Sequence, residues 1–156
     1  MRALGIDPGT ATGWCVLEAP LRMVACGLIR GGRRAKESEG SAYARTRTAI
    51  REVIETYLPS IIFHETWIMH KGVYAAHKLG AYQAMIQEEV YNAGGLPCIA
   101  LSVTAIKAFA TGHPHADKAK MAASARLLWP SADFQSYDVV DAAHIARLGL
   151  AKHIPI

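Results

Sequence analysis

The sequence predicts an α/β protein with a mixed five-stranded sheet flanked by helices, in a single domain that spans residues 1–156. Apolar runs rich in β-forming residues come first and follow one another closely, as the strands of a meander do. After residue 40, segments with apolar residues every three to four positions alternate with further apolar runs, which indicates helices between strands. The length suits one domain, and 51% apolar against 19% charged residues exclude a disordered chain.

The expected strands are short apolar runs that stop at turn residues or at an acid. The first ends at the turn signal Asp7-Pro8-Gly9. The fourth is an unalternated run that Glu65 terminates, which is typical of a central strand covered on both faces. The sequence thus predicts strands at residues 2–6, 14–17, 23–29, 60–65 and 96–101.

The expected helices are the longer segments with helical periodicity. In the first of them, apolar side chains recur at helical spacing until Pro59 stops the pattern. The second ends at Gly94-Gly95, a helix stop signal. Residues 31–40 are polar, glycine-rich and charged, and we expect an exposed loop there. The sequence thus predicts helices at residues 41–58, 73–92, 102–110, 117–128 and 137–151.

Charge and cysteine usage restrict the class of protein without selecting one. The chain carries 17 basic and 13 acidic residues, a net charge of +4, which suits a polyanionic partner. Cys15, Cys26 and Cys98 form no CxxC pair and lie in apolar runs, so we expect reduced, buried thiols. No apolar run approaches ~18 residues, and Asp7 interrupts the region where a secretory signal needs apolar residues. We therefore expect a cytoplasmic protein.

Four carboxylates stand where a catalytic site is expected. Asp7 and Glu65 follow directly on two apolar strands, and open α/β folds place their sites at strand ends. Asp138 and Asp141 lie three residues apart, on one face of the last helix. Gathering these charges is unfavourable unless a cation compensates them. Oxygen ligands favour Mg²⁺ or Mn²⁺ over zinc, and two such ions suit hydrolysis of a phosphodiester.

Each acid also has a structural interpretation. Asp138 suits the N-cap of the last helix, with Asp141 as a favourable acid in its first turn. Asp7-Pro8-Gly9 on its own is typical of a tight turn. Glu65 is harder to explain structurally, because an acid that continues Ile-Ile-Phe is excluded from a core. The residues alone leave both interpretations open.

The motifs together resemble the RuvC-type Holliday junction resolvases, a family of crossover junction endodeoxyribonucleases. The opening LGIDPGTATGW resembles the family's first motif, in which a strand delivers an aspartate into Asp-Pro-Gly. Phe63-His64-Glu65 resembles the second motif, and residues 138–143, DVVDAA, resemble the Asp-x-x-Asp-Ala signature. The likeness covers nearly the whole chain. Its further matches are Lys78-Leu79-Gly80, the SVTAIK segment at 102–107, Thr111-Gly112 and Ala116-Asp117-Lys118.

The resemblance implies an RNase H-like fold, a homodimer and paired, symmetric nicking of four-way DNA junctions. It makes one set of residues both the catalytic groups and the metal ligands: Asp7, Glu65, Asp138 and Asp141. We expect two Mg²⁺ ions in each site, with Mn²⁺ able to substitute, and 5′-phosphate products. Lys107 and Lys118 match family lysines that contact DNA phosphates or assist at the site.

Other basic and small residues suit a branched-DNA substrate and a dimer. A two-fold dimer matches the symmetry of a junction, and the stripe Ala76, Gly80 and Ala84 is the candidate for part of its interface. A partner helicase for branch migration is left open. Together with Lys107 and Lys118, the candidate phosphate contacts are Arg33, Arg34, Lys36, Lys71, Lys78 and Lys120.

Two positions depart from the family pattern. The family often carries an aromatic residue where this chain has Ile68, so Trp67 or Tyr74 becomes the candidate for stacking on a base; packing in the core or dimer is the alternative. His144 follows Asp141 by three residues, so it either orients a ligand or handles a proton, or is a partly exposed helix histidine. His64 alternates away from Glu65 and is expected in the interior.

Three other functions compete with a strict resolvase. Residues 5–10 also resemble the phosphate-binding hairpin of the actin and sugar-kinase group, but those ATPases close two domains around ATP and this chain supplies one. A junction-binding module without cleavage gains nothing from four carboxylates that face phosphate. A relaxed nuclease that also cuts flaps and forks is the nearest alternative.

Overall fold

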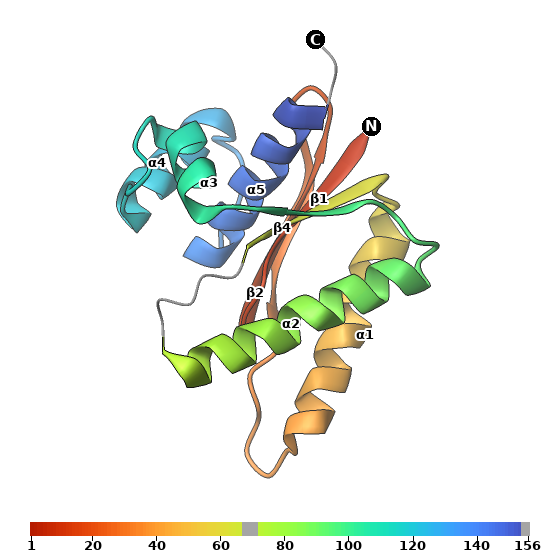
Figure 1. The fold of residues 1–156 in the computed structure, drawn as a ribbon. Helices are drawn as coiled ribbons and strands as arrows, with labels where there is room; N and C mark the ends of the chain where they lie inside the picture. The colour runs from red at the N-terminus through yellow and green to blue at the C-terminus, as the bar shows by residue number, and fades with distance from the viewer. Residues whose placement is uncertain (67–71, 154–156) are drawn as a thin grey trace.

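The computed structural model describes residues 1–66 and 72–153, and Figure 1 shows a single sheet with helices packed around it. The predicted α/β class with a mixed five-stranded sheet is confirmed. Its strands are β1 (Arg2–Asp7), β2 (Ala11–Glu18), β3 (Arg22–Arg30), β4 (Ile61–Glu65) and β5 (Cys98–Leu101). Its helices are α1 (Glu39–Tyr57), α2 (Val73–Asn92), α3 (Val103–Thr111), α4 (Lys118–Leu128) and α5 (Tyr137–His153).

The strand order is β3-β2-β1-β4-β5, with β1 in the centre. The first three strands form the predicted antiparallel meander, in which Gly5 pairs with Cys15 and Cys15 pairs with Cys26. After the meander, β4 returns parallel to β1, with Phe63 beside Gly5, and β5 adds parallel to β4. A parallel return needs a long crossover, which α1 and α2 supply.

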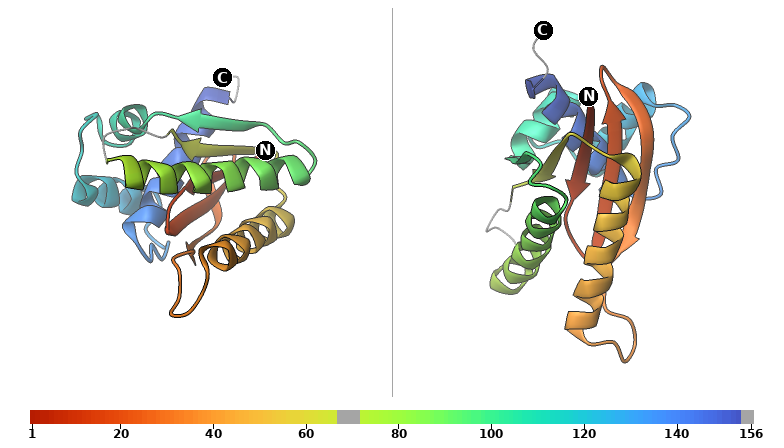
Figure 2. Two further views of the ribbon diagram at one scale, coloured as in Figure 1. Left: turned by 60° about the horizontal axis from the view of Figure 1, so that its bottom comes forward. Right: turned by 90° about the vertical axis from the view of Figure 1, so that its right-hand side faces the viewer.

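Helices cover both faces of the sheet (Figure 2). On one face, Leu4 and Ile62 of the central strands pack with residues of α1 and α2, including Ile50 and Ile86. On the other face, strand residues such as Phe63 pack with α3, α4 and α5. Burial on both faces explains why the 61–65 run is apolar without alternation.

Several predicted boundaries shift by a few residues. Helix α1 begins at Glu39 rather than at residue 41, because the Ser38 hydroxyl accepts a hydrogen bond from the Ser41 amide and so caps the helix. Strand β2 is longer than predicted and β5 is shorter. In the described part of the chain, no helix combines the length and apolarity that crossing a membrane requires.

The three cysteines are free, as predicted. Cys15 is buried as predicted, but the prediction of burial is wrong for Cys26 and Cys98, which are only half-buried. Burial raises the pKa of the Cys98 thiol to about 11, so this group is protonated at neutral pH. The cysteines therefore act as small apolar residues in the described structure.

Candidate active site

Asp7 and Glu65 end neighbouring parallel strands. Ile6 of β1 lies beside His64 of β4 in the strand register, so the two acids that follow occupy adjacent positions at the carboxyl edge of the sheet. Strand neighbours are ~4.8 Å apart in the hydrogen-bonding direction. Both acids are half-buried. The structure thus brings together two acids that are 58 positions apart in the sequence.

Both acids project onto the face of the sheet that α5 covers. A Cβ on Gly5 would lie 2.2 Å from the carbonyl oxygen of Ala142 in α5, and a Cβ on Gly149 of α5 would lie 2.2 Å from the Phe63 ring. Side chains two residues apart on a strand share a face. Asp7 follows Gly5 by two residues and Glu65 follows Phe63 by two, so each carboxylate lies on the α5 side.

The start of α5 packs directly beside Asp7. Gly13 of β2 pairs with Asp7 across the antiparallel ladder. A Cβ on Gly13 would come within 2.0 Å of the Asp138 carbonyl oxygen, so no larger residue fits between β2 and the helix. This contact places the start of α5 at the edge of the sheet where Asp7 and Glu65 end their strands, with Asp138 in the first turn of the helix and Asp141 just beyond it.

Asp138 does not cap α5. The Val139 amide donates a hydrogen bond to the Ser136 hydroxyl at 3.3 Å, so Ser136 provides the cap and the N-cap interpretation of Asp138 is wrong. Asp138 lies inside the first turn of the helix, and both Asp138 and Asp141 are half-buried. The only structural role left for Asp138 is a favourable interaction of its negative charge with the dipole of α5.

The donor chemistry of this edge suits a hard divalent cation, because all four groups are carboxylates. As the side chains stand, no three His, Cys, Asp or Glu residues within 1–66 and 72–153 lie close enough together to hold a metal ion. The backbone therefore gathers the four acids at one edge, while their side chains are not grouped around a common point.

Two of the predicted phosphate contacts flank this edge. Lys118 Nζ lies 5.4 Å from the ring centroid of Tyr137, the residue before Asp138. Lys107 is half-buried on α3. The N-cap of α3, Ser102, directly follows Leu101, the residue of β5 that pairs with Glu65. Both lysines thus belong to elements that begin beside the carboxylates.

The remaining predicted contacts are spread over other surfaces. Arg33 and Arg34 are exposed in the loop between β3 and α1, and Lys36 and Lys120 are also exposed. Lys78 of α2 lies 3.9 Å from Glu39 and 5.6 Å from the centroid of the Tyr74 ring, which is exposed. Three positions that the sequence singled out lie outside the described residues: Trp67, Ile68 and Lys71.

His144 belongs to the core, and the expectation of a partly exposed helix histidine is wrong. Its side chain is fully buried beneath α4, and its Nε2 lies 3.1 Å from the Met121 carbonyl oxygen. Nδ1 has no hydrogen-bond partner among the described residues. Burial lowers the pKa of His144 to about 4, so the ring is neutral at pH 7. The interior position predicted for His64 is confirmed: its Nδ1 lies 3.0 Å from the Glu65 carbonyl oxygen.

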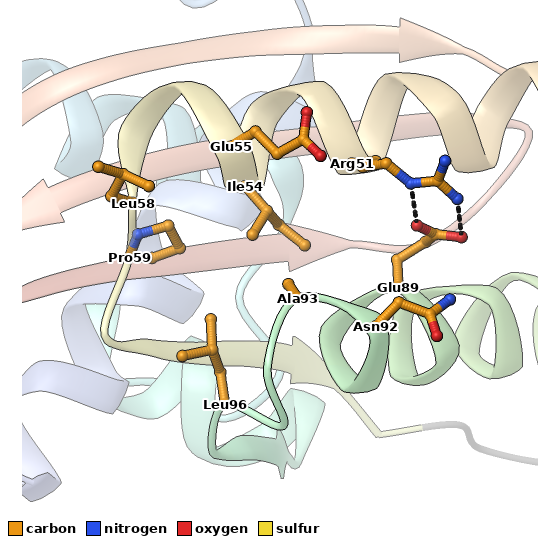
Figure 3. Close-up of a pocket in the computed structure, with 9 residues that line it drawn as sticks. All are labelled: Arg51, Ile54, Glu55, Leu58, Pro59, Glu89, Asn92, Ala93 and Leu96. Atoms are coloured by element: carbon orange, nitrogen blue, oxygen red, sulfur yellow. Dashed lines mark hydrogen bonds and ion pairs between the residues drawn. The ribbon is translucent and has the colours of Figure 1, made fainter.

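A pocket between α1 and α2 lies away from the carboxylates (Figure 3). Its wall contains Glu89, whose buried carboxylate accepts hydrogen bonds from Arg51 at 2.8 and 3.1 Å and from Arg47 at 3.0 Å. Pro59 and Leu96, which also line it, precede β4 and β5. The pocket therefore opens at the amino ends of these strands, opposite the edge that carries Glu65.

Comparisons with known proteins give consistent results. The family model described as "Crossover junction endodeoxyribonuclease RuvC" matches residues 3–148, a range that contains all four acids. The protein of that name from Nitrobacter hamburgensis is 30% identical over 152 residues, covering 94% of this chain and 86% of its own length. The one from Allorhizobium ampelinum is 29% identical over 150 residues, covering 94% of this chain and 87% of its own.

Solved structures agree on the fold. The structure described as "T. thermophilus RuvC in complex with Holliday junction substrate" superposes with a TM-score of 0.82 at 23% identity, covering 95% of this chain and 92% of the other. The predicted RNase H-like fold is confirmed.

Proposed function

The chain belongs to the RuvC family of crossover junction endodeoxyribonucleases, and we infer from this that it is a Holliday junction resolvase. It is thus a hydrolase of phosphodiester bonds that acts in DNA recombination and repair. The observation that carries the inference is the edge of the sheet where Asp7 and Glu65 end adjacent strands and the first turn of α5 packs on Gly13. Four acids on one edge suit a nuclease better than a protein that only binds DNA.

We assign the catalytic role to Asp7, Glu65, Asp138 and Asp141. Membership of the family implies a nuclease that depends on a divalent metal ion. The carboxylate donors support Mg²⁺, with Mn²⁺ able to substitute, and we propose two ions for each site. When bound, such ions supply an activated water for attack on phosphorus and stabilise the departing 3′ oxygen, which leaves 5′-phosphate ends.

The residues of the chain itself bind and orient the substrate. Ionised carboxylates repel phosphate, so a binding surface needs cations around them. The helices that carry Lys107 and Lys118 begin beside the acids, and we propose that the two lysines contact phosphates near the cleaved bond. Arg33 and Arg34 are proposed to contact phosphates farther along the DNA. The roles proposed for Lys71, and for Trp67 as a stacking residue, are taken from the sequence alone.

Paired symmetric nicks require two active sites, and we propose that a homodimer supplies them. The exposed side of α2 supports this placement. Val73 and Tyr74 are 82% and 76% exposed, and Ala76 and Gly80 line an open, largely apolar groove beside them. A second copy of α2 would cover these apolar side chains. We also keep the cytoplasm as the proposed location, because a DNA substrate and free thiols suit it.

The decisive test offers purified protein a labelled four-way junction, a flap and a linear duplex, each with Mg²⁺ or with EDTA. Symmetric, Mg²⁺-dependent nicks confined to the junction are the expected result. Equal cutting of the flap would favour a relaxed branched-DNA nuclease instead. Tight junction binding without any cutting, with Mg²⁺ or with Mn²⁺, would favour a binding module and overturn the assignment of the four acids.

A further inference from the structure

The loop between β3 and α1 presents a group of positive charges. Arg33, Arg34 and Lys36 are exposed in it, and Arg30, also exposed, ends β3 just before it. Within the described part of the chain, none of these four side chains forms an ion pair. In Figure 1 the loop is the orange segment that projects at the bottom of the molecule. Exposed cations on a projecting loop suit a polyanion such as the DNA backbone.

Hydrogen bonds from Arg45 of α1 hold both ends of this loop, at residues 30–32 and at Glu37. The Arg45 guanidinium donates to both oxygens of Glu37, at 2.9 and 3.2 Å. It also donates to the carbonyl oxygens of Arg30 and Gly32, at 2.5 and 3.0 Å. Glu37 in turn accepts a hydrogen bond from the Arg34 amide at 2.8 Å. The Glu37 and Arg45 side chains are 12% and 25% exposed, so this ion pair is partly shielded from water.

The locked loop is attached to the turn that follows Asp7. The Gly32 amide donates a hydrogen bond to the Thr10 carbonyl oxygen at 2.9 Å. Next to it, Arg30 pairs with Ala11 in the ladder between β3 and β2. Continuous hydrogen bonds therefore run from Glu37 through Arg45 and Gly32 to the turn three residues beyond the first catalytic aspartate.

The loop conformation is one that the chain would not keep by itself. Lys36 has a φ of +63°, in the left-handed region that non-glycine residues rarely adopt. Such a conformation persists where surrounding contacts fix it. The hydrogen bond from the Arg34 amide to Glu37 spans Lys36, and Arg45 fixes Glu37, so these contacts provide the constraint.

We propose that the Glu37–Arg45 ion pair is a positioning device for DNA. It holds Arg33 and Arg34 beside the Asp7 turn, where they bind phosphates of the strand on one side of the cleaved bond. The inference rests on the proposed function, because it assumes that DNA enters at the carboxylate edge. A loop held in its binding conformation avoids the entropic cost of ordering its side chains on binding.

The test uses a substitution that should strengthen junction binding if only net charge matters and weaken it if the ion pair positions the loop. Glu37→Gln makes the protein more positive by one charge, which on electrostatics alone strengthens binding to DNA. If the ion pair positions the loop, the same change weakens junction binding about three- to tenfold, because two or more side chains become disordered. Glu52→Gln is the matched control, since Glu52 is an exposed acid elsewhere on α1. Arg45→Lys keeps the charge but loses the two-pronged contact, and is expected to behave like Glu37→Gln.

Binding is measured against salt concentration on a labelled junction in EDTA, and cleavage in Mg²⁺. The expected loss for Glu37→Gln and Arg45→Lys appears in Kd and KM with kcat unchanged, while Glu52→Gln matches the wild type. Arg33→Ala with Arg34→Ala, both exposed, is expected to lower the salt slope by about 2. Binding by Glu37→Gln as tight as by Glu52→Gln, or an unchanged slope without the two arginines, would overturn the proposal. If the wild type neither binds nor cuts junctions, the proposed function itself is wrong, and the positioning role fails because it depends on that function.

Discussion

The backbone of Asp138 lies in direct contact with Gly13, so close that a Cβ on the glycine would be 2.0 Å from the aspartate's carbonyl oxygen. Gly13 is also the ladder partner of Asp7. A residue with no side chain, on the strand paired with β1, thereby sets how closely the start of α5, which carries Asp138, approaches the sheet edge that carries Asp7.

Substitution of Gly13 by alanine is expected to move α5 away from β2. The added methyl has no free space, because its three nearest atoms are all backbone atoms of Asp138 and Val139. We expect a loss of about 1–3 kcal/mol in the free energy of unfolding, as for an overpacked core, and at least a tenfold loss of cleavage. Urea denaturation and junction cleavage measure the two effects.

Gly40→Ala is the control for this substitution. A Cβ at Gly40, in the first turn of α1, meets nothing within 4 Å. This change is expected to be neutral or to stabilise the protein by up to about 1 kcal/mol. Wild-type stability and cleavage for Gly13→Ala would show that the close approach of α5 is not needed.

His144 is expected to make stability depend on pH. Its folded pKa of about 4 lies below the ~6.5 of an unfolded histidine, so between these values the unfolded chain binds the extra proton. The stabilisation is therefore complete above pH 6.5 and is lost as the pH falls toward 4, by about 3 kcal/mol. Denaturation of the wild type and of His144→Leu at pH 7 and pH 4 measures the difference. The variant should lose less stability, whereas His115→Gln, at an exposed loop position, should match the wild type.

His144→Leu also tests whether His144 is only a core residue or has an accessory role in catalysis. Because His144 is buried against Met121, its replacement should leave cleavage at pH 7 within about threefold of the wild type once the protein is folded. A loss of several hundredfold in a stable variant would restore the accessory role.

Local sequence patterns were sufficient to predict the strands and the helices, and they made the four acids candidates for a site without deciding between a structural and a catalytic role. The apolar runs before Asp7 and Glu65 mark strand ends directly, because an acid cannot continue into a core covered on both faces. Their meeting depends on β4 pairing with β1 in one register, which no local pattern specifies. The resemblance of the motifs supplied that relationship before the structure did.

Packing details were out of reach of sequence patterns. The cap at Ser136 and the acid at Asp138 are two residues apart, and both are good N-cap residues, so only the geometry of α5 separates them. His144 lies on a face that becomes buried only when α4 packs over α5. Glu37 and Arg45 are eight positions apart, in a loop and a helix, and no periodic spacing connects them.

Lys118 is expected to contribute one phosphate contact. Lys118→Ala should reduce the slope of log K against log salt by about 0.9 and weaken binding similarly for junctions of different sequence. Lys152→Ala removes the same charge from the far end of α5 and serves as the control. An equal change of slope in both variants would indicate that only net charge matters and that Lys118 has no specific contact.

Gly80→Leu tests the proposed dimer face on α2. A Cβ at Gly80 meets nothing within 4 Å, so a leucine fits the isolated chain and should leave its helical circular dichroism unchanged. It would occupy the space that a second α2 needs. We expect light scattering to report the 16.9 kDa monomer for this variant and a dimer for Gly40→Leu. A dimeric Gly80→Leu would place the interface elsewhere.

The most direct test of the central claim is cleavage of a labelled four-way junction by Asp7→Asn. The substitution keeps the size of the side chain and removes one negative charge from the carboxylate edge. We predict normal folding, retained junction binding and a loss of cleavage of about a thousandfold or more in Mg²⁺. Asp133→Asn, an exposed acid in the loop before α5, should cut like the wild type. Near-normal paired nicking by Asp7→Asn would contradict the assignment of the carboxylate edge as the active site.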